Sequence, residues 1–361
     1  MIQKILNTEN YTKQNLVKLL QSEGNDRKLL FSKSSAVKEE HIANIVYLRA
    51  LIEFSNHCEK DCLYCGIRKS NSSPKRYTIP QEEVNKTIDS AINKGYSSIV
   101  IQAGECKDEE FIETINNALI YAKEQSGNKL GITLSLGEQE KSTYQKWFDL
   151  GAHRYLLRIE SSSKELFETI HPRNENHSFE TRLQKLKELK EIGFQVGTGV
   201  MIGLPNQTLE DLADDLLFMK AFDIDMCGMG PYIVSPDTPL AKLAHKIPSE
   251  ESRIDLSLKM IALLRLLMND INIASTTALQ TLTERAREEG IKVGANIIMP
   301  NLTAVDFKES YKLYNKKTDL KSHDDTLAAI NLQMERVGHK VEIGKWGDSL
   351  HFEKKCCHKL I

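Results

Sequence analysis

The stretch VYLRALIEFSNHCEKDCLYC, residues 46–65, places an apolar run directly before three cysteines. Residues 46–54 have the length and composition of a buried strand. The loop that follows carries Cys58, Cys62 and Cys65, which are three of the seven cysteines in the 361-residue chain. Cysteines this tightly clustered predict a metal-binding or catalytic site rather than a set of structural thiols.

Further apolar runs follow the first one, and segments with helical periodicity separate them. In residues 81–95, for example, Val84, Ile88, Ala91 and Ile92 form one apolar stripe. Alternating strands and helices predict a parallel sheet, and eight such units over roughly 250 residues are typical of a (βα)8 barrel. The eight predicted strands are residues 46–54, 98–104, 131–137, 154–160, 194–203, 225–233, 271–277 and 293–300.

The predicted fold class is therefore α/β, a TIM-type (βα)8 barrel with helical additions at both ends. We expect an N-terminal helical extension over residues 1–45, the barrel over 46–315, and a C-terminal helical extension and tail over 316–361. No long linker or low-complexity segment interrupts these parts.

Two of the predicted helices carry capping signals at their start. Thr78 is expected to cap the helix after it, with Gln81 as the second residue of a capping box. Thr208 and Asp211 form the same signal before the run LEDLADDLLFMKAF.

Charge and hydropathy exclude several functional classes. The formal net charge is −2, so no overall basic field favours nucleic acid or an anionic membrane. The longest apolar stretch, residues 260–268, is much shorter than a membrane span, and Arg265 interrupts it. The polar N-terminus lacks an apolar signal core. We therefore expect a soluble, cytoplasmic protein.

The predicted strands place polar side chains on one face. Thr133 and Ser135 alternate with apolar residues in the third strand, and Arg154, Arg158 and Glu160 share one parity in the fourth. Burying these charges under the helices would be costly. A polar, water-containing barrel interior that serves as a reaction chamber is the better interpretation.

Three interpretations of the cysteines compete. A redox pair at Cys62 and Cys65 would not need Cys58. A structural zinc site takes four ligands, and His57 is a strained fourth because it adjoins Cys58. A 4Fe–4S cluster normally takes four cysteines, so three would leave one iron open to an exogenous ligand. This last interpretation explains the missing ligand, and the loop after the first strand lies where barrel active sites form.

The spacing Cys58-x3-Cys62-x2-Cys65 resembles the signature of the radical S-adenosylmethionine (SAM) superfamily. The resemblance implies that these cysteines hold one 4Fe–4S cluster whose open iron chelates SAM. It also implies reductive cleavage of SAM to a 5′-deoxyadenosyl radical. Tyr64 stands where the superfamily has an aromatic residue beside the adenine.

Later segments resemble other elements of the superfamily in the expected order. Gly104 and Glu105, in QAGE, resemble the motif that holds the SAM amino group. Met201, between Gly199 and Gly203 in GVMIG, resembles the element that lines the adenosine site.

A wider set of blocks resembles HydE, a family of radical SAM maturases that help to build the active-site cluster of FeFe hydrogenase. The resemblance covers roughly residues 45–315. Biotin synthase and methylornithine synthase share the barrel and the cysteine motif but fit these blocks less well. The blocks are LIEFSNHCEKDCLYCGIRKSN, TLSLGE, RYLLRIES, GLPNQTLEDLADDLLF, GPYIVSPDTPLA, STTAL and GANIIMPN.

The HydE resemblance implies further SAM ligands at Arg158, Glu160 and Arg182. A carboxylate suits an ammonium group or ribose hydroxyls, and an arginine suits the methionine carboxylate. It also implies an anion site at the base of the barrel interior, where hydroxyls and a guanidinium would hold a carboxylate. By position, that site would use Thr133, Ser135, Arg154, Thr276 and Thr277.

The resemblance also implies a substrate and partners. The substrate proposed for the family is an iron–cysteine complex with carbonyl and cyanide ligands, supplied by the maturase HydG. The implied partners are HydG, HydF and a reductant such as ferredoxin or flavodoxin, with no nucleic acid and no membrane. Two other functions stay open: a radical SAM mutase or synthase of the methylornithine or biotin type, and a non-catalytic iron–sulfur scaffold.

The chain departs from the HydE pattern at several points. Many members carry an auxiliary cluster near the C-terminus, but residues 314–333 contain no cysteine, so we expect one cluster only. Gln280 replaces a common glycine, and Ala103 a common serine.

The remaining cysteines lie outside the motif. Cys227 is expected to pack as a small hydrophobe. Cys106 follows Glu105 at the active face, where a structural and a functional role compete. Cys356, Cys357 and His358 are interpreted as an incidental tail, with metal binding as the alternative.

Overall fold

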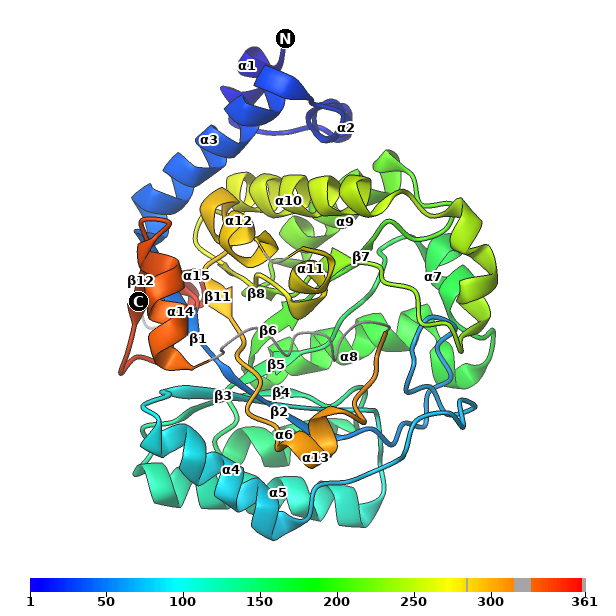
Figure 1. Cartoon of the computed structure of the whole chain (residues 1–361), viewed down its shortest axis with the longest axis vertical. Helices are drawn as coiled ribbons and strands as arrows, with labels where there is room; N and C mark the ends of the chain where they lie inside the picture. The colour runs from blue at the N-terminus through cyan, green and yellow to red at the C-terminus, as the bar shows by residue number, and fades with distance from the viewer. Residues whose placement is uncertain (284, 315–325, 359–361) are drawn as a thin grey trace.

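The computed structural model describes residues 1–283, 285–314 and 326–358 (Figure 1). Its main sheet has seven parallel strands in the order β10-β8-β6-β5-β4-β3-β2. Its members are β2 (Ala50–Ser55), β3 (Ser98–Ala103), β4 (Gly131–Ser135), β5 (Arg154–Leu156), β6 (Gln195–Thr198), β8 (Met226–Cys227) and β10 (Asn272–Ile273).

An eighth strand position closes this sheet into a barrel. β11 (Ile297–Ile298) pairs in parallel with β1 (Ile45–Leu48), which continues past Arg49 into β2. A single parallel bridge between Ala274 and Ile297 connects β11 to the β10 side. All eight predicted strands are present, so the predicted barrel is confirmed.

Three of the predicted strands are split in two. The first forms β1 and β2, the fifth forms β6 and β7 (Met201–Ile202), and the sixth forms β8 and β9 (Gly230–Pro231). β7 and β9 pair with each other beyond the main sheet.

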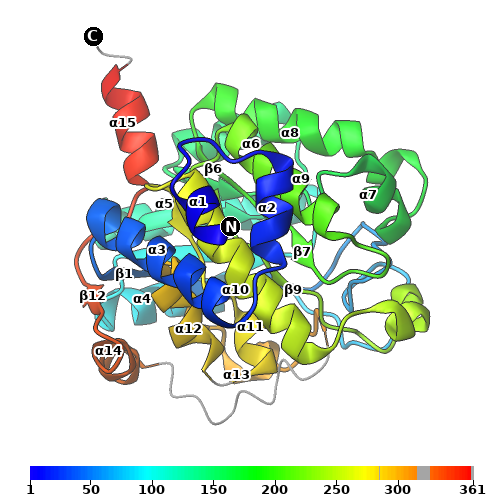
Figure 2. The same ribbon diagram turned by 90° about the horizontal axis from the view of Figure 1, so that it is seen from above.

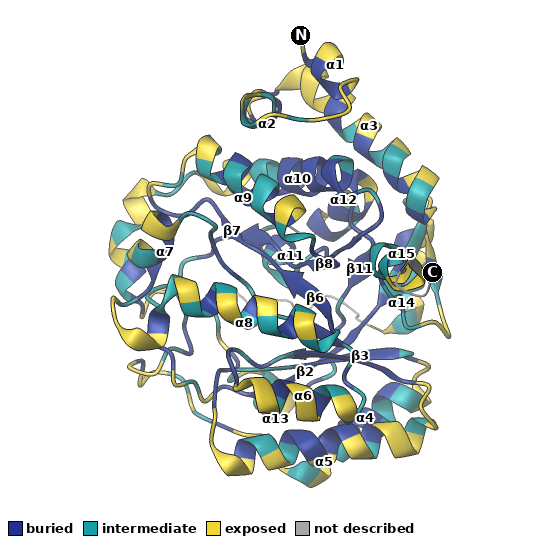
Figure 3. Cartoon of the chain, turned by 180° about the vertical axis from the view of Figure 1, so that it is seen from behind, coloured by how far each residue is buried: buried dark blue, intermediate teal, exposed yellow. Residues whose placement is uncertain are grey.

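Helices surround the barrel and bury their apolar stripes against the strands (Figures 1 and 3). In α4, Val84, Ile88 and Ala91 are buried as the periodicity predicted. The surrounding helices are α4 (Gln81–Asn93), α5 (Glu109–Ser126), α6 (Lys141–Asp149), α7 (Lys164–Ile170), α8 (Phe179–Ile192), α9 (Leu209–Phe222), α10 (Glu250–Leu267), α11 (Thr277–Leu282), α12 (Ala286–Val293) and α13 (Val305–Lys308). The 3-10 helices η1 (Glu175–His177) and η2 (Pro239–Lys246) lie in the connections.

The two capping predictions have different outcomes. Thr208 and Asp211 form the predicted capping box at the start of α9. The prediction for Thr78 was wrong, because α4 begins after Pro80 without a side-chain cap. Thr78 instead bridges to Ser55, and their hydroxyl oxygens lie 2.9 Å apart.

Additional elements lie at both ends of the chain. Of the N-terminal helices, α2 (Lys13–Leu20) packs against α9 and α10, α3 (Gly24–Ile42) packs against α10, and α1 (Ile2–Leu6) packs against α2 and α3. At the other end, α14 (Leu327–Glu335) and β12 (Lys340–Glu342) precede α15 (Leu350–His358), which projects from the body (Figure 2). The predicted boundary at residues 315–316 lies outside the described residues and stays a prediction. In the described part of the chain, no helix has the length and apolarity needed to span a membrane.

The segment between β12 and α15 closes the base of the barrel. The Gly347 carbonyl accepts hydrogen bonds from Arg49 (3.1 Å) and from the Asn272 amide (2.9 Å). Asp348 forms an ion pair with Arg154 at 2.7 Å. Among the described residues, the barrel interior is therefore closed at this end, and a cavity opens at the opposite end, where the strands terminate.

Candidate active site

The loop after β2 carries the three cysteines and is attached to the end of β3. The Glu59 N–H donates to the Glu105 carbonyl at 2.7 Å, and the Glu105 N–H contacts the Cys58 sulfur at 3.4 Å. This close approach requires Gly104, because a Cβ there would collide with the His57 carbonyl. The QAGE segment thus sets the position of the cysteine loop.

A cavity of about 300 Å³ opens at this end of the barrel. Cys58, Cys62 and Cys65 line it. So do the residues expected to bind SAM, which are Tyr64, Gly104, Glu105, Arg158, Glu160, Arg182 and Met201. Ser135, Thr276 and Thr277, from the expected anion site, also face the cavity. Residues from seven separate parts of the sequence therefore meet around one space.

The three thiols suit a cluster of several irons. Burial raises the pKa of Cys62, and the neighbouring Cys65 and Cys58 raise it further. Burial also raises the pKa of Cys65, to about 12. Three thiolates in this position therefore need bound cations, which irons would provide.

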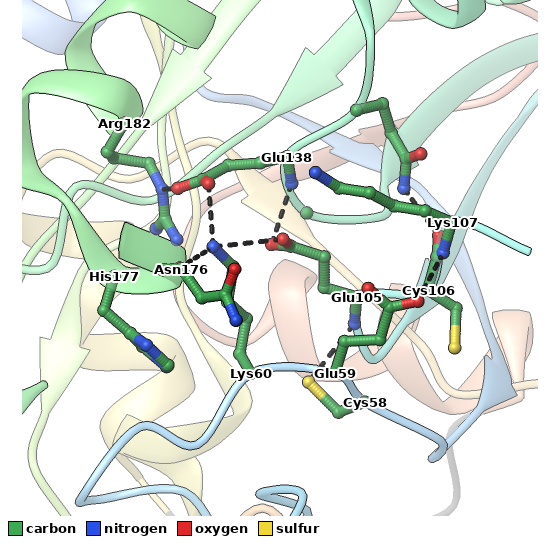
Figure 4. A network of polar contacts seen from close by, with 12 residues as sticks. Cys58, Glu59, Lys60, Glu105, Cys106, Lys107, Glu138, Asn176, His177 and Arg182 are labelled. Carbon is green, nitrogen blue, oxygen red and sulfur yellow. Dashed lines mark hydrogen bonds and ion pairs between the residues drawn. The ribbon is translucent and has the colours of Figure 1, made fainter. Parts of the chain in front are cut away.

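A buried ionic network lies behind the cysteine loop (Figure 4). Lys60 lies between two carboxylates, 2.8 Å from Glu138 and 3.2 Å from Glu105. Its ammonium group also donates to the Asn176 carbonyl. On the other side of Glu138, Arg182 approaches within 2.5 Å. The network therefore links the cysteine loop to the ends of β3 and β4 and to α8.

The two carboxylates of this network differ in pKa. Burial would raise the pKa of Glu138, but Arg182 and Lys60 outweigh burial and lower it to about 2. For Glu105, burial and then the charge of Glu138 raise the pKa above its ordinary value. The Glu105 carboxylate also accepts the Glu138 N–H at 2.8 Å. Glu138 is thus held as an anion, and Glu105 depends on nearby cations to remain one.

A second charged pair faces the cavity from the end of the fourth strand. The Arg158 guanidinium lies 3.0 Å from Glu160, and it donates to the Val200 carbonyl at 2.9 Å. Arg182 also donates to the Arg158 carbonyl at 2.5 Å. In the described contacts Arg182 uses two of its five N–H donors, which leaves the others for an anion in the cavity.

Two residues of the expected anion site lie elsewhere. Arg154 is fully buried at the base of the barrel, where Thr133, Ser98 and Asp348 occupy its donors. Neither Thr133 nor Arg154 lines the cavity. The expectation that they face a ligand there is therefore corrected. Both side chains point into the barrel, as their positions in the strands predicted. They lie one layer of side chains below the cavity, however, nearer the base of the barrel.

Several cavity residues had no predicted role. Glu138, which directly follows the predicted strand 131–137, does not line the cavity but supports it from behind through Lys60, which lies within the cysteine motif itself. Glu53, Gln102 and Tyr311 line the cavity. An acidic residue just after a strand was the one signal in the sequence for Glu138, because barrel active sites form at strand ends.

The four cysteines outside the motif lie in two different environments. Cys227 is buried, with its sulfur 3.6 Å from that of Met219, so its predicted packing role is confirmed. Cys106 is also buried. Cys356 and Cys357 are exposed on α15.

Comparison with known proteins agrees with this site. Residues 52–219 match the Radical SAM superfamily. The [FeFe] hydrogenase maturase subunit HydE of Thermotoga maritima is 40% identical over 320 residues, which cover 88% of each chain. A biotin synthase of Carboxydothermus hydrogenoformans is 22% identical over 302 residues, covering 82% of this chain and 89% of that protein.

A solved structure shows the same fold. The crystal structure of methylornithine synthase superposes with a TM-score of 0.81 at 24% sequence identity. The match covers 95% of this chain and 97% of that one.

Proposed function

This chain belongs to the HydE family of radical SAM proteins, and from this we propose that it is a SAM-dependent radical enzyme in the maturation of FeFe hydrogenase. The observation that carries the proposal is the cavity, where three thiols stand beside charged groups suited to SAM. The identity of 40% to a HydE, against 22% to a biotin synthase, favours maturation over the synthase alternative.

Cys58, Cys62 and Cys65 would hold one 4Fe–4S cluster, which supplies the electron that cleaves SAM to methionine and a 5′-deoxyadenosyl radical. The protein's task is to bind and orient SAM. The Glu105 carboxylate accepts a hydrogen bond from the SAM amino group, and the free donors of Arg182 bind its carboxylate. Glu160 accepts a ribose hydroxyl.

The substrate would lie deeper in the cavity, near Ser135, Thr276 and Thr277. The Thr276 hydroxyl oxygen is buried and has no hydrogen-bond partner among the described residues, so a polar ligand group would satisfy it. We propose a carboxylate there, as in an iron–cysteine complex with carbonyl and cyanide ligands. HydG would supply this complex, HydF would act downstream, and ferredoxin or flavodoxin would supply electrons.

The test is anaerobic reconstitution, reduction with dithionite and assay of 5′-deoxyadenosine from SAM. We expect about four irons per chain, the content of one cubane cluster. Alanine at Cys58, Cys62 or Cys65 should abolish cleavage, whereas Cys356→Ala, a control on the exposed helix, should retain it.

Three results would contradict parts of the proposal. Stoichiometric zinc without reconstitutable iron would exclude the cluster. An iron-loaded protein that transfers its cluster but never cleaves SAM would be a scaffold. Cleavage that does not respond to the HydG product would favour the mutase or synthase alternative.

A further inference from the structure

Glu160 has an unusual backbone conformation. Its φ is 67°, in the left-handed region that residues other than glycine seldom adopt. Its N–H donates to the Gly199 carbonyl at 3.0 Å, and its own carbonyl accepts the Met201 N–H at 3.0 Å. Such a conformation persists only where surrounding contacts hold it, and it occurs often at functional sites.

The turn that follows Glu160 is held by Asp215 of α9. One carboxylate oxygen of Asp215 accepts both the N–H and the hydroxyl of Ser162, each at 2.6 Å. Ser163, the next residue, caps α7 through the Leu166 N–H. Residues 160–163 are therefore fixed on both sides, by the neighbouring strand and by α9.

Asp215 is a costly residue to keep at this position. Its side chain is fully buried, and its second carboxylate oxygen has no partner among the described residues. Burial raises the pKa of Asp215 to about 7, and the acidic side chains Asp211 and Asp214 also raise it. A buried carboxylate without a countercharge destabilises the fold. We therefore expect Asp215 to have a role that offsets this cost, and its contacts indicate that it holds the turn at Ser162 in place.

We propose that Asp215 is a positioning residue for SAM binding, which acts by clamping Ser162 and thereby holding Glu160 with its carboxylate in the cavity. The inference rests on the proposed function, because it takes Glu160 as a ligand of SAM. Asp215 itself does not line the cavity, so its effect passes through the turn.

The test compares three variants of the cluster-loaded, oxidised protein, in which SAM binds without being cleaved. Asp215→Ala should weaken SAM affinity about ten-fold, as small displacements of binding groups do. Asp215→Asn should bind within about two-fold of the parent, because its amide oxygen accepts the same two hydrogen bonds. Asp214→Ala, a matched control on the same helix that pairs with Lys13, should bind like the parent. Equilibrium dialysis measures all three.

A double-mutant cycle separates positioning from general damage to the fold. In a Glu160→Ala background, Asp215→Ala should weaken SAM binding no further, because the two residues act through one contact. Amide hydrogen exchange of residues 160–163 should also accelerate in Asp215→Ala but not in Asp214→Ala. If Asp215→Ala folds poorly, Ser162→Ala tests the same clamp and should weaken affinity by a smaller factor.

The outcomes distinguish this inference from the proposed function. A parent protein that binds SAM while Asp215→Ala binds it equally well would overturn the clamp alone. The clamp would also be overturned if Asp215→Ala still weakened SAM affinity ten-fold in the Glu160→Ala background. A parent that does not bind SAM would overturn the proposed function, and the exchange measurement would still decide whether Asp215 holds the turn.

Discussion

At the scale of single residues, the position of Lys60 makes a prediction about SAM. Replacing it by methionine leaves Glu105 and Glu138 with Arg182 as the one cation beside them in the described network. The pKa of Glu105, which burial already raises, should then rise further. A protonated Glu105 is a poor acceptor for the N–H groups of the SAM amino group, so SAM affinity should fall about ten-fold near pH 6.5. Because an acid with a raised pKa ionises as the pH increases, affinity should recover by about pH 8.5.

Equilibrium dialysis of SAM with the oxidised, cluster-loaded protein measures this effect at both pH values. Lys69→Met is the matched control, since Lys69 is an exposed lysine of the same loop. The same affinity and the same pH profile as in the parent would show that Glu105 does not receive the SAM amino group.

The residues of the site differ in how far the sequence could predict them. The three cysteines were predictable as a group because all lie in one loop, where their spacing alone indicates a candidate ligand set. Glu138 was not, since its partners Lys60, Arg182 and Glu105 lie 78, 44 and 33 positions away. Ion pairs across such separations become visible only when the barrel brings strand ends together.

At the scale of elements, α15 is attached to the barrel by charges. Its basic side chains lie against acidic residues near the ends of α9 and α10. The pairs are His351 with Asp223 and Asp270, Lys354 with Asp270, and Lys355 with Asp223 and Asp225. The hydrogen bond to Asp270 raises the pKa of His351, burial opposes it, and the bond to Asp223 adds to the rise.

This attachment should depend on pH. A histidine with a raised folded-state pKa stabilises the fold fully below its unfolded pKa of about 6.5, and that contribution is lost as pH rises through the folded value. Asp223 and Asp270, the two partners of His351, have lowered pKa values, so their contribution is lost only in acid, below about pH 4. Replacing His351 by glutamine should therefore cost about 0.5–1 kcal/mol near pH 5.5 and much less near pH 8.5.

Urea unfolding at the two pH values measures the difference. His41→Gln is a control, because His41 is a partly exposed histidine at the end of α3. An equal cost of His351→Gln at both pH values would show that the charge of His351 does not hold α15.

The sequence predicted the strands of the barrel better than the breaks within those strands. Short runs rich in apolar residues located every strand of the barrel, because the face of each strand that packs against the helices is apolar even where the inner face is polar. The break between β6 and β7 had no such signal. It occurs where Gly199 meets the Gly228 backbone so closely that a Cβ would not fit. Thr78 and Thr208 carry similar capping signals in the sequence. Thr208 caps its helix as predicted, whereas Thr78 bridges to Ser55 and does not cap α4.

At the scale of the whole molecule, the sequence predicted which side chains point inward but not their depth. Period two placed Arg154 inside the barrel, as observed. Depth depends on how the barrel closes, and residues 346–349 close it from almost 200 positions away in the sequence. Arg154 therefore meets Asp348 rather than a ligand.

Asp348 is the carboxylate that balances two buried arginines at this closure. It pairs with Arg154 at 2.7 Å, and the charges of Arg154 and Arg49 act on each other. Burial would raise the pKa of Asp348, but His153 and Arg154 outweigh it and hold the pKa below its usual range. Asp348→Ala should therefore destabilise the protein by about 3–5 kcal/mol, the usual cost of leaving one partner of a buried pair uncompensated.

Urea unfolding near pH 7 tests this prediction. The control is Glu342→Ala, which removes a carboxylate of the preceding strand β12 whose partner Lys345, at 3.9 Å, is largely exposed. The control should lower the free energy of unfolding by less than about 1 kcal/mol.

Combining Arg154→Met with Asp348→Leu should lower the free energy of unfolding by less than the sum of the two single changes, because it removes both charges together. SAM affinity should stay near that of the parent in every folded variant, since the closure and the cavity lie at opposite ends of the barrel. If Asp348→Ala kept its stability while Arg154→Ala lost only substrate-dependent turnover, Arg154 would belong to the substrate site after all, and the closed base would have to open during the reaction.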